Sequence, residues 1–166
     1  MIFDPLTAFL WWFVDQPLMA CAPAAIYSYG PISSLVLYRE GQFQVELFLV
    51  APGAGFPSEH RHPRVDTYEV NVWGHIPLTV NGTRAQPIAV QRPDGHTLYI
   101  TRVRETDWHG AEILPDGGAF LSVQYWLGMT TPTSVGLEWE GVPTSMFHAN
   151  LLDIHDPSAP QETALL

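Results

Sequence analysis

Short runs of β-branched and aromatic residues, separated by turn residues at regular intervals, constrain the fold of this chain most. The turns carry the Gly, Asn and Asp residues that supply positive φ angles, at Glu40-Gly41, Asn81-Gly82, Pro93-Asp-Gly95 and Pro115-Asp-Gly-Gly118. This spacing is typical of an all-β sandwich or barrel, and about eight strands suit a jelly roll. We expect strands at Leu35–Arg39, Gln42–Val50, Asp66–Trp73, Ile76–Val80, Pro87–Gln91, Thr97–Thr101, Ala119–Trp126 and Val135–Trp139.

The two ends of the chain follow other patterns. Asp4 is a good helix N-cap and Pro5 suits the first helical position. The apolar residues that follow share one helical face: Leu6, Phe9, Leu10 and Phe13. We predict an amphipathic helix that packs on the domain or on a neighbouring subunit. The 166 residues suit one domain, with a helix and linker in residues 1–31, a β-barrel in 32–142, and an irregular tail in 143–166 that packs on the barrel or on a neighbour.

Charge and cysteine content exclude several classes of partner. Seven basic and 17 acidic residues give a net charge of -10, which repels nucleic-acid phosphates and anionic lipid headgroups. The apolar run near the N-terminus is preceded by Asp4 and by no basic residue, unlike a secretory signal, and it is too short to span a bilayer. Cys21 is the single cysteine, so no internal disulfide is possible. We expect a cytoplasmic protein that binds no nucleic acid.

Histidines are the main indication of chemistry in this sequence. His60 and His62 lie one residue apart, and side chains two residues apart on a β-strand project to the same face. The pair therefore offers two neutral nitrogen ligands to one ion. His109, which follows one apolar run and precedes another, is the candidate for a third ligand.

The region from Gly53 to Gln124 resembles the cupins, a family of small jelly-roll barrels with an internal metal site. In the first cupin motif a Gly, five residues, His-x-His, three or four residues, a Glu, six residues and a Gly follow in order. His60, His62 and Gly74 match this motif, whereas Gly55 is one residue too close and Thr67 stands where the glutamate is expected. In the second motif Gly95 and His109 are the counterparts, separated by three residues more than usual.

The resemblance implies a divalent transition metal held by His60, His62 and His109. Glu69 shares the predicted strand face of Thr67 and is our preferred carboxylate ligand. Asp66 in a shifted register, or water alone, are the alternatives. Such a ligand set suits Fe, Mn, Ni or Zn. The polar residues expected to orient a small molecule in the barrel are Asn71, Gln124 and Arg102.

Two classes of function follow from this resemblance. The first is a metal-binding protein with a small-molecule site, acting as a dioxygenase, an isomerase or a lyase. The second is a non-catalytic assembly protein, in which Trp73, Trp108 or Trp126 fills the barrel. Several stretches are also similar to cupin-like proteins encoded by tailed phages, which implies a capsid, tail or attachment component located in the virion. The apolar ends lead us to expect a homo-oligomer or a larger protein assembly.

Overall fold

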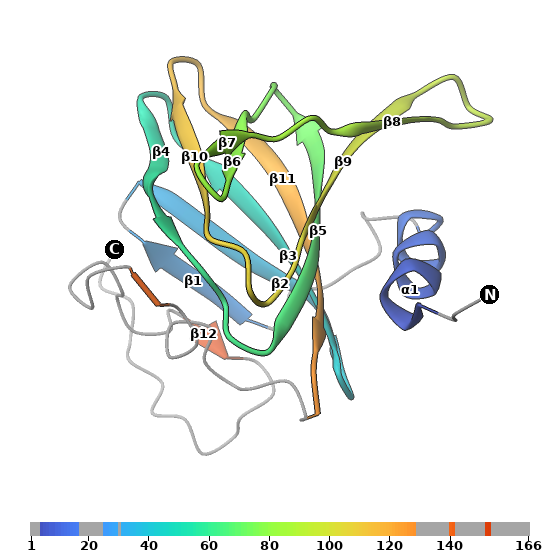
Figure 1. Ribbon diagram of the computed structural model, residues 1–166. Coiled ribbons are helices and arrows are strands. Elements are labelled where there is room, and N and C mark those ends of the chain that lie inside the picture. Colours follow the sequence, from blue (N-terminus) through green and yellow to red (C-terminus); the bar gives the residue numbers. More distant parts are fainter. Residues whose placement is uncertain (1–3, 17–24, 30, 129–139, 142–151, 154–166) are drawn as a thin grey trace.

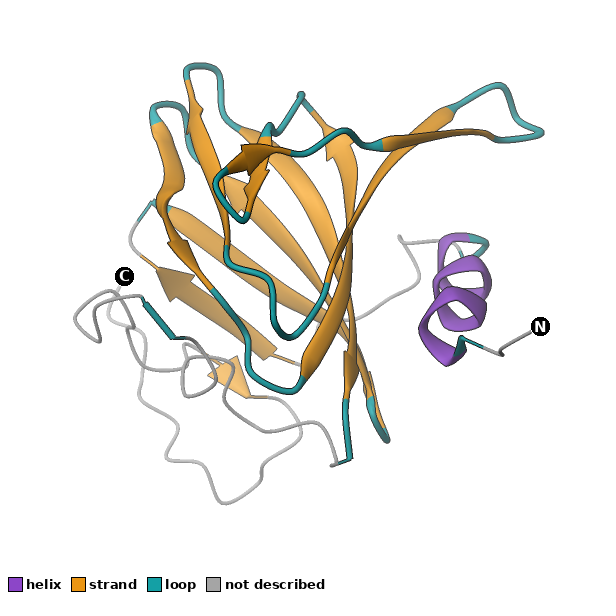
Figure 2. Ribbon diagram, in the orientation of Figure 1, coloured by secondary structure: helices purple, strands orange, loops and turns teal. Residues whose placement is uncertain are grey.

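Antiparallel strands make up most of the protein, as the pattern of short apolar runs predicts. The computed structural model describes residues 4–16, 25–29, 31–128, 140–141 and 152–153. Two sheets face each other in a jelly-roll barrel, with one helix outside it (Figure 1). Apart from that helix, the described chain consists of strands and connecting loops (Figure 2). No described helix is long and apolar enough to cross a membrane.

The larger sheet has eight strands in the order β12-β1-β2-β3-β11-β5-β9-β8. Its strands are β1 (Ala25–Tyr29), β2 (Ile32–Glu40), β3 (Phe43–Val50), β5 (Val65–Trp73), β8 (Ile88–Gln91), β9 (Thr97–Val103), β11 (Gly118–Trp126) and β12 (Leu152–Asp153). β11 lies at its centre and pairs with β3 on one side and β5 on the other.

The smaller sheet has four strands in the order β4-β10-β6-β7. These are β4 (Ala54–His60), β10 (His109–Leu114), β6 (Leu78–Val80) and β7 (Thr83–Arg84). Asn81 and Gly82 both adopt positive φ angles, of 50° and 74°, in the tight turn that joins β6 to β7. The Asn-Gly turn signal is thereby confirmed.

Most of the predicted strands correspond to strands of the larger sheet. The prediction omitted β4 and β10, two strands of the smaller sheet, and placed Ala25–Tyr29 in a linker, whereas this segment forms β1. The predicted strand Val135–Trp139 lies outside the described residues. In the predicted tail, Leu152–Asp153 pairs with β1, and the rest of 143–166 also lies outside the described residues.

Helix α1 (Pro5–Val14) covers the outer face of the larger sheet. The Asp4 side chain accepts a hydrogen bond from the Leu6 amide, as an N-cap does, and Pro5 is the first helical residue. The predicted apolar face is buried at Leu6, Phe9, Leu10 and Phe13. The helix therefore packs on its own domain, where it contacts outward-facing strand residues that include Val45, Val70, Leu121 and Val123.

Alternation along the central strands gives the larger sheet two different faces. In β11, Leu121 and Val123 belong to the helix-covered core, whereas Phe120, Ser122 and Gln124 line the barrel interior. The interior is apolar where Phe48 and Phe120 stack, with ring centroids 4.9 Å apart. Farther along β3 and β11 the inward positions Gln44, Glu46, Ser122 and Gln124 are polar. This polar part of the interior lies opposite the histidines of the smaller sheet.

Candidate metal centre

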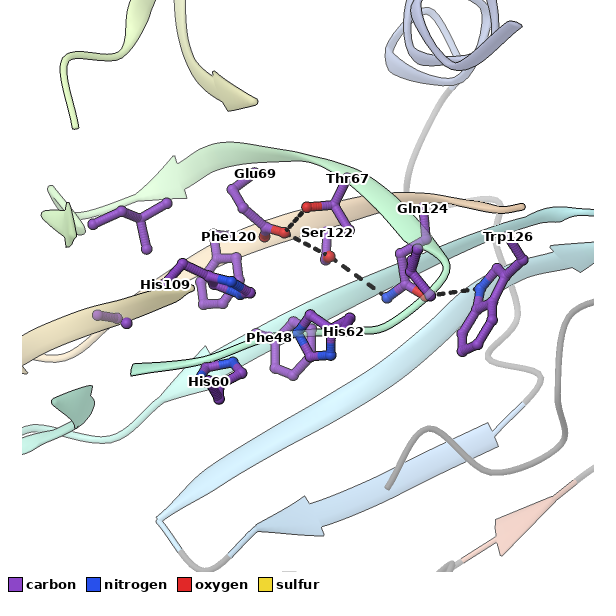
Figure 3. A pocket seen from close by; sticks show the side chains of 14 residues that line it. Phe48, His60, His62, Thr67, Glu69, His109, Phe120, Ser122, Gln124 and Trp126 are labelled. Atoms are coloured by element: carbon purple, nitrogen blue, oxygen red, sulfur yellow. Dashed lines mark hydrogen bonds between the residues drawn. The ribbon is translucent and has the colours of Figure 1, made fainter. Parts of the chain in front are cut away.

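Three histidines come together at one edge of the smaller sheet. His60 is the last residue of β4 and His109 is the first residue of β10, and the two are direct partners across the antiparallel ladder. His62 lies two residues beyond His60. One ring nitrogen of each histidine lies within 4.8 Å of those of the other two (Figure 3). The structure thus brings together the three side chains that the sequence motif singles out.

Removal from water keeps the imidazoles of His62 and His109 neutral at pH 7. His60 and His109 are buried, and His62 is partly exposed. Removal from water lowers the pKa of His109 to about 4. Removal from water, together with the nearby His109 and His60, lowers the pKa of His62 well below its usual value. Neutral imidazoles retain the lone pair that a metal ion requires.

Neighbouring backbone fixes the position of the segment that carries His60 and His62. Between them, Arg61 exchanges two backbone hydrogen bonds with Glu140, of 3.0 and 2.9 Å, and its Nε donates to Glu140 Oε2 at 2.6 Å. The Arg61 guanidinium lies 5.3 Å from the centroid of Trp108. Arg61 is thus held by contacts other than those of the histidine rings.

Glu69 lies in the same cavity but outside the histidine cluster. Its Oε1 accepts hydrogen bonds from Thr67 Oγ1 at 2.7 Å and from Ser122 Oγ at 2.9 Å. Burial raises the pKa of Glu69 to about 7, against the effect of these two hydrogen bonds and with a further increase from Glu46. Its carboxylate oxygens do not join the three histidine nitrogens within 4.8 Å of one another.

A second buried carboxyl, Glu46, is connected to Glu69 through Gln124 and Ser122. Gln124 Nε2 donates to Glu46 Oε1 at 3.0 Å and lies 3.5 Å from Ser122 Oγ. Gln124 Oε1 accepts from Trp126 Nε1 at 3.2 Å, so that a hydrogen-bonded row runs from Thr67 to Trp126 (Figure 3). Ser34 and Gln44 also donate to Glu46, and burial raises the pKa of Glu46.

The cavity beside the histidines is lined by side chains from both sheets. Its apolar lining includes Phe48, Phe120 and Trp126, and its polar lining includes Glu69 and Gln124. Trp126 is fully buried in this wall. The other two tryptophans expected to fill a structural barrel do not do so, because Trp73 and Trp108 are 61% and 37% exposed.

The remaining predicted site residues lie elsewhere. Asn71 lines a second, outer cavity rather than the histidine cavity. Arg102 was expected to orient a ligand, but its guanidinium donates to Asp4 and Asp66, both at 2.8 Å, and lies over the Tyr68 ring. Arg102 and Asp66 therefore attach helix α1 to the barrel. Both residues thus make their ion pairs away from the histidines.

Sequence reasoning missed four polar residues of the interior: Ser34, Gln44, Glu46 and Ser122. A signal for three of them was present in the sequence. In the apolar strands β3 and β11, polar residues recur at alternate positions, as Gln44 with Glu46 and Ser122 with Gln124. Polar residues with a period of two indicate a polar face, and here that face points into the barrel.

Known proteins resemble this chain in structure and not in sequence. No protein-family model matches the sequence, and no curated protein matches it. The chain is similar to an RmlC-like cupin from Shewanella frigidimarina, with 15% identity over 68% of this chain and 90% of the other, and a TM-score of 0.49. KdgF from Halomonas sp. has 16% identity over 57% and 78% of the two chains, with a TM-score of 0.45.

A sugar phosphate isomerase of the cupin superfamily from Silicibacter pomeroyi has 17% identity over 67% of this chain and 74% of the other, with a TM-score of 0.42. The pairing of the two antiparallel sheets by itself makes the fold a jelly roll. At these identities the likeness concerns the fold, and the functional argument rests on the histidine cluster.

Proposed function

We propose that the protein binds one divalent transition metal ion through His60, His62 and His109, and a small molecule in the adjoining cavity. The observation that carries this proposal is the convergence of three ring nitrogens within 4.8 Å of one another at the edge of a cavity. Neutral ring nitrogens that converge in this way can serve as ligands of one ion.

The donor set fits such an ion. Imidazole nitrogens bind Zn, Fe, Ni and Mn, and small side-chain rotations bring donors at these separations to one ion. The depressed pKa values of His62 and His109 keep both rings unprotonated and ready to bind at pH 7. A bound ion would supply a Lewis acid with open coordination positions for a ligand oxygen.

The cavity lining determines what the chain itself contributes. Phe48, Phe120 and Trp126 exclude water from one side of the site, while Gln124 is held by hydrogen bonds to Glu46 and Trp126. A small molecule beside the histidines therefore meets a rigid wall with a few fixed polar groups. The dioxygenase, isomerase and lyase classes are all compatible with this arrangement.

A non-catalytic assembly component, such as a phage capsid, tail or attachment part, is the second candidate. Large exposed apolar side chains favour it, since Trp73 is 61% exposed and Ile113 is 57% exposed. In this case the metal would serve to stabilise the fold.

Metal analysis tests the main proposal. We expect the wild-type protein, incubated with zinc and desalted, to retain one ion per chain by elemental mass spectrometry. His60→Ala, His62→Ala and His109→Ala should each lose most of it, whereas His96→Ala, which changes an exposed histidine, should retain it. A wild-type protein without zinc, or equal loss in the His96 variant, would contradict the proposal.

A further inference from the structure

The two oxygens of the Glu69 carboxyl differ in the hydrogen bonds that they accept. Oε1 accepts from both Thr67 and Ser122, whereas Oε2 has no hydrogen-bond partner among the described residues. The side chain is only 7% exposed. A buried carboxylate oxygen without a donor is costly, so it indicates either a bound proton or a ligand at this atom.

Glu69 also lies between two cavities. It lines the histidine cavity and a second cavity whose polar lining includes Asn71, His75, Arg84 and Thr101. Leu78 is the other residue that lines both. The carboxyl is therefore placed to meet a molecule beside the histidines on one side and polar groups of the outer cavity on the other.

Hydrogen bonds fix the orientation of this carboxyl and connect it to a second one. Thr67 lies two residues before Glu69 on β5. Ser122 on β11 is the direct cross-strand partner of Glu69. Ser122 is followed by Gln124 and Glu46 in the same hydrogen-bonded row. Because Glu46 is fully buried, a charge on either carboxyl disfavours a charge on the other.

We propose that Glu69 is the proton-exchanging group of the histidine cavity and is not a metal ligand. The inference rests on the proposed function, because the proton's partner is the small molecule bound beside the histidines. Oε2 takes a proton from a hydroxyl-bearing carbon next to a carbonyl, and the electrons of the broken C–H bond move into the carbonyl group to give an enediolate. Return of that proton to the former carbonyl carbon, with transfer of the hydroxyl proton to the former carbonyl oxygen, completes an isomerisation and restores the carboxylate, with no oxidant or reductant.

The acid–base properties of Glu69 agree with this role. A general base works best when its pKa lies near the working pH, and burial brings the pKa of Glu69 to about 7. The groups that face it are Thr67 and Ser122 from β5 and β11, Glu46 from β3, the three histidines across the cavity, and His75 and Arg84 in the outer cavity.

Zinc binding and carboxyl NMR together test the inference. We expect Glu69→Gln to bind zinc with the wild-type stoichiometry and an affinity within about threefold, whereas loss of a ligand or of its support lowers affinity by about tenfold or more. In zinc-loaded wild-type protein with ¹³C-labelled glutamate carboxyls, one resonance should titrate near pH 7 and be absent from the variant. Tenfold weaker zinc binding, or a Glu69 resonance that does not titrate between about pH 5 and 9, overturns the inference.

A second variant keeps the test decisive if Glu69→Gln fails to fold. Ser122→Ala removes one donor to the Glu69 carboxylate, so the titration midpoint should rise, and an unchanged midpoint counts against the proposed arrangement. If the wild-type protein binds no zinc, the proposed function fails by itself. The titration of Glu69 in the metal-free protein would still decide whether this carboxyl exchanges a proton near pH 7.

Discussion

Burial acts in opposite directions on the two kinds of titratable group in the cavity. It favours the neutral form of each, so the pKa of Glu69 rises to about 7 and that of His109 falls to about 4. At pH 6 both groups are therefore uncharged in the folded protein, while an unfolded chain carries charge on the carboxylate and on much of the imidazole. As pH rises, the raised pKa of Glu69 therefore lowers the free energy of unfolding, whereas the lowered pKa of His109 increases it.

Replacing Glu69 isolates the contribution of this carboxyl to the pH dependence of the unfolding free energy. Between its ordinary pKa of 4.5 and about 7, the folded carboxyl keeps a proton that the unfolded chain releases, so its contribution to the unfolding free energy falls as pH rises. The contribution is complete below pH 4.5 and is lost above about pH 7. We expect Glu69→Gln to gain stability relative to wild type from pH 4.5 to 8, by about 3 kcal/mol at most.

Urea unfolding of the metal-free proteins at several pH values measures this difference, and His109 contributes equally to both chains. Stability curves that run parallel across the whole range would show that Glu69 is not the group with the raised pKa.

Residue-level prediction succeeded where it depended on the alternation of side chains. The period of two placed Thr67 and Glu69 on one strand face, and both line the cavity. Asn71, placed on the same face, lines the outer cavity instead. Alternation predicts on which face of the sheet a side chain lies. It predicts neither the hydrogen-bond partners of that side chain nor how far the side chain extends. Arg102 pairs with Asp4, 98 residues away, and no local pattern encodes that ion pair.

At the scale of elements, the attachment of α1 depends strongly on Asp4. Its carboxylate accepts from the Leu6 amide and from Thr7 Oγ1, and it pairs with Arg102 at 2.8 Å. We expect Asp4→Ala to lower the unfolding free energy by about 1–2 kcal/mol, as the loss of an N-cap does. Asp15 at the other end of the helix pairs with Arg92 and is the matched control.

Asp15→Ala should change the unfolding free energy by less than about 0.5 kcal/mol, because the Asp15 side chain is 60% exposed and solvent weakens its ion pair. Urea unfolding followed by tryptophan fluorescence reports on both variants through Trp11 and Trp12 of the helix. Equal losses in the two variants would argue against a special role for Asp4.

Gly55 controls the approach of the two strands that carry the histidines. A Cβ atom at this position would lie 2.5 Å from the carbonyl oxygen of Glu112, closer than real contacts allow. We expect Gly55→Ala to separate β4 from β10, to lower the unfolding free energy by about 1–3 kcal/mol, and to weaken zinc binding.

Gly41→Ala is the control for this change. It introduces a Cβ with no atom within 4 Å, in a turn at φ 56°, and should leave zinc binding unchanged. The two variants are compared by urea unfolding and by zinc stoichiometry. Intact zinc binding in the Gly55 variant would mean that the close approach of β4 and β10 is not needed for the site.

These two strands are also among the elements that sequence analysis missed. β4 reads Ala54-Gly-Phe-Pro-Ser-Glu-His60, and its Gly, Pro and charged residues are poor strand signals. β10 has two register shifts in its pairing with β4 and begins at His109-Gly110. Tertiary pairing, rather than local propensity, makes both segments extended.

At the scale of the whole molecule, an apolar row remains exposed on the larger sheet. Leu49 and Trp73 flank Ala119 on the neighbouring strands and are 43% and 61% exposed. Neither belongs to the core under α1. We predict that the protein self-associates through this row, as a dimer or a higher ring.

Light scattering at micromolar concentration should give a mass above the 18.5 kDa of one chain. Trp73→Glu should shift the protein towards the monomer, whereas Ile88→Glu, at a similarly exposed position on β8, should not. A monomeric wild-type protein would contradict the prediction.

The opposite faces of β11 make this chain far more sensitive to changes of length than to changes of composition. Ser122 and Gln124 face the cavity while Leu121 and Val123 face the helix, and the strand is paired on both sides. Inserting one residue into β11 would turn every later side chain to the other face. Polar groups would then lie beneath α1 and aliphatic ones beside the histidines, so a single inserted codon would damage helix docking and the candidate site together.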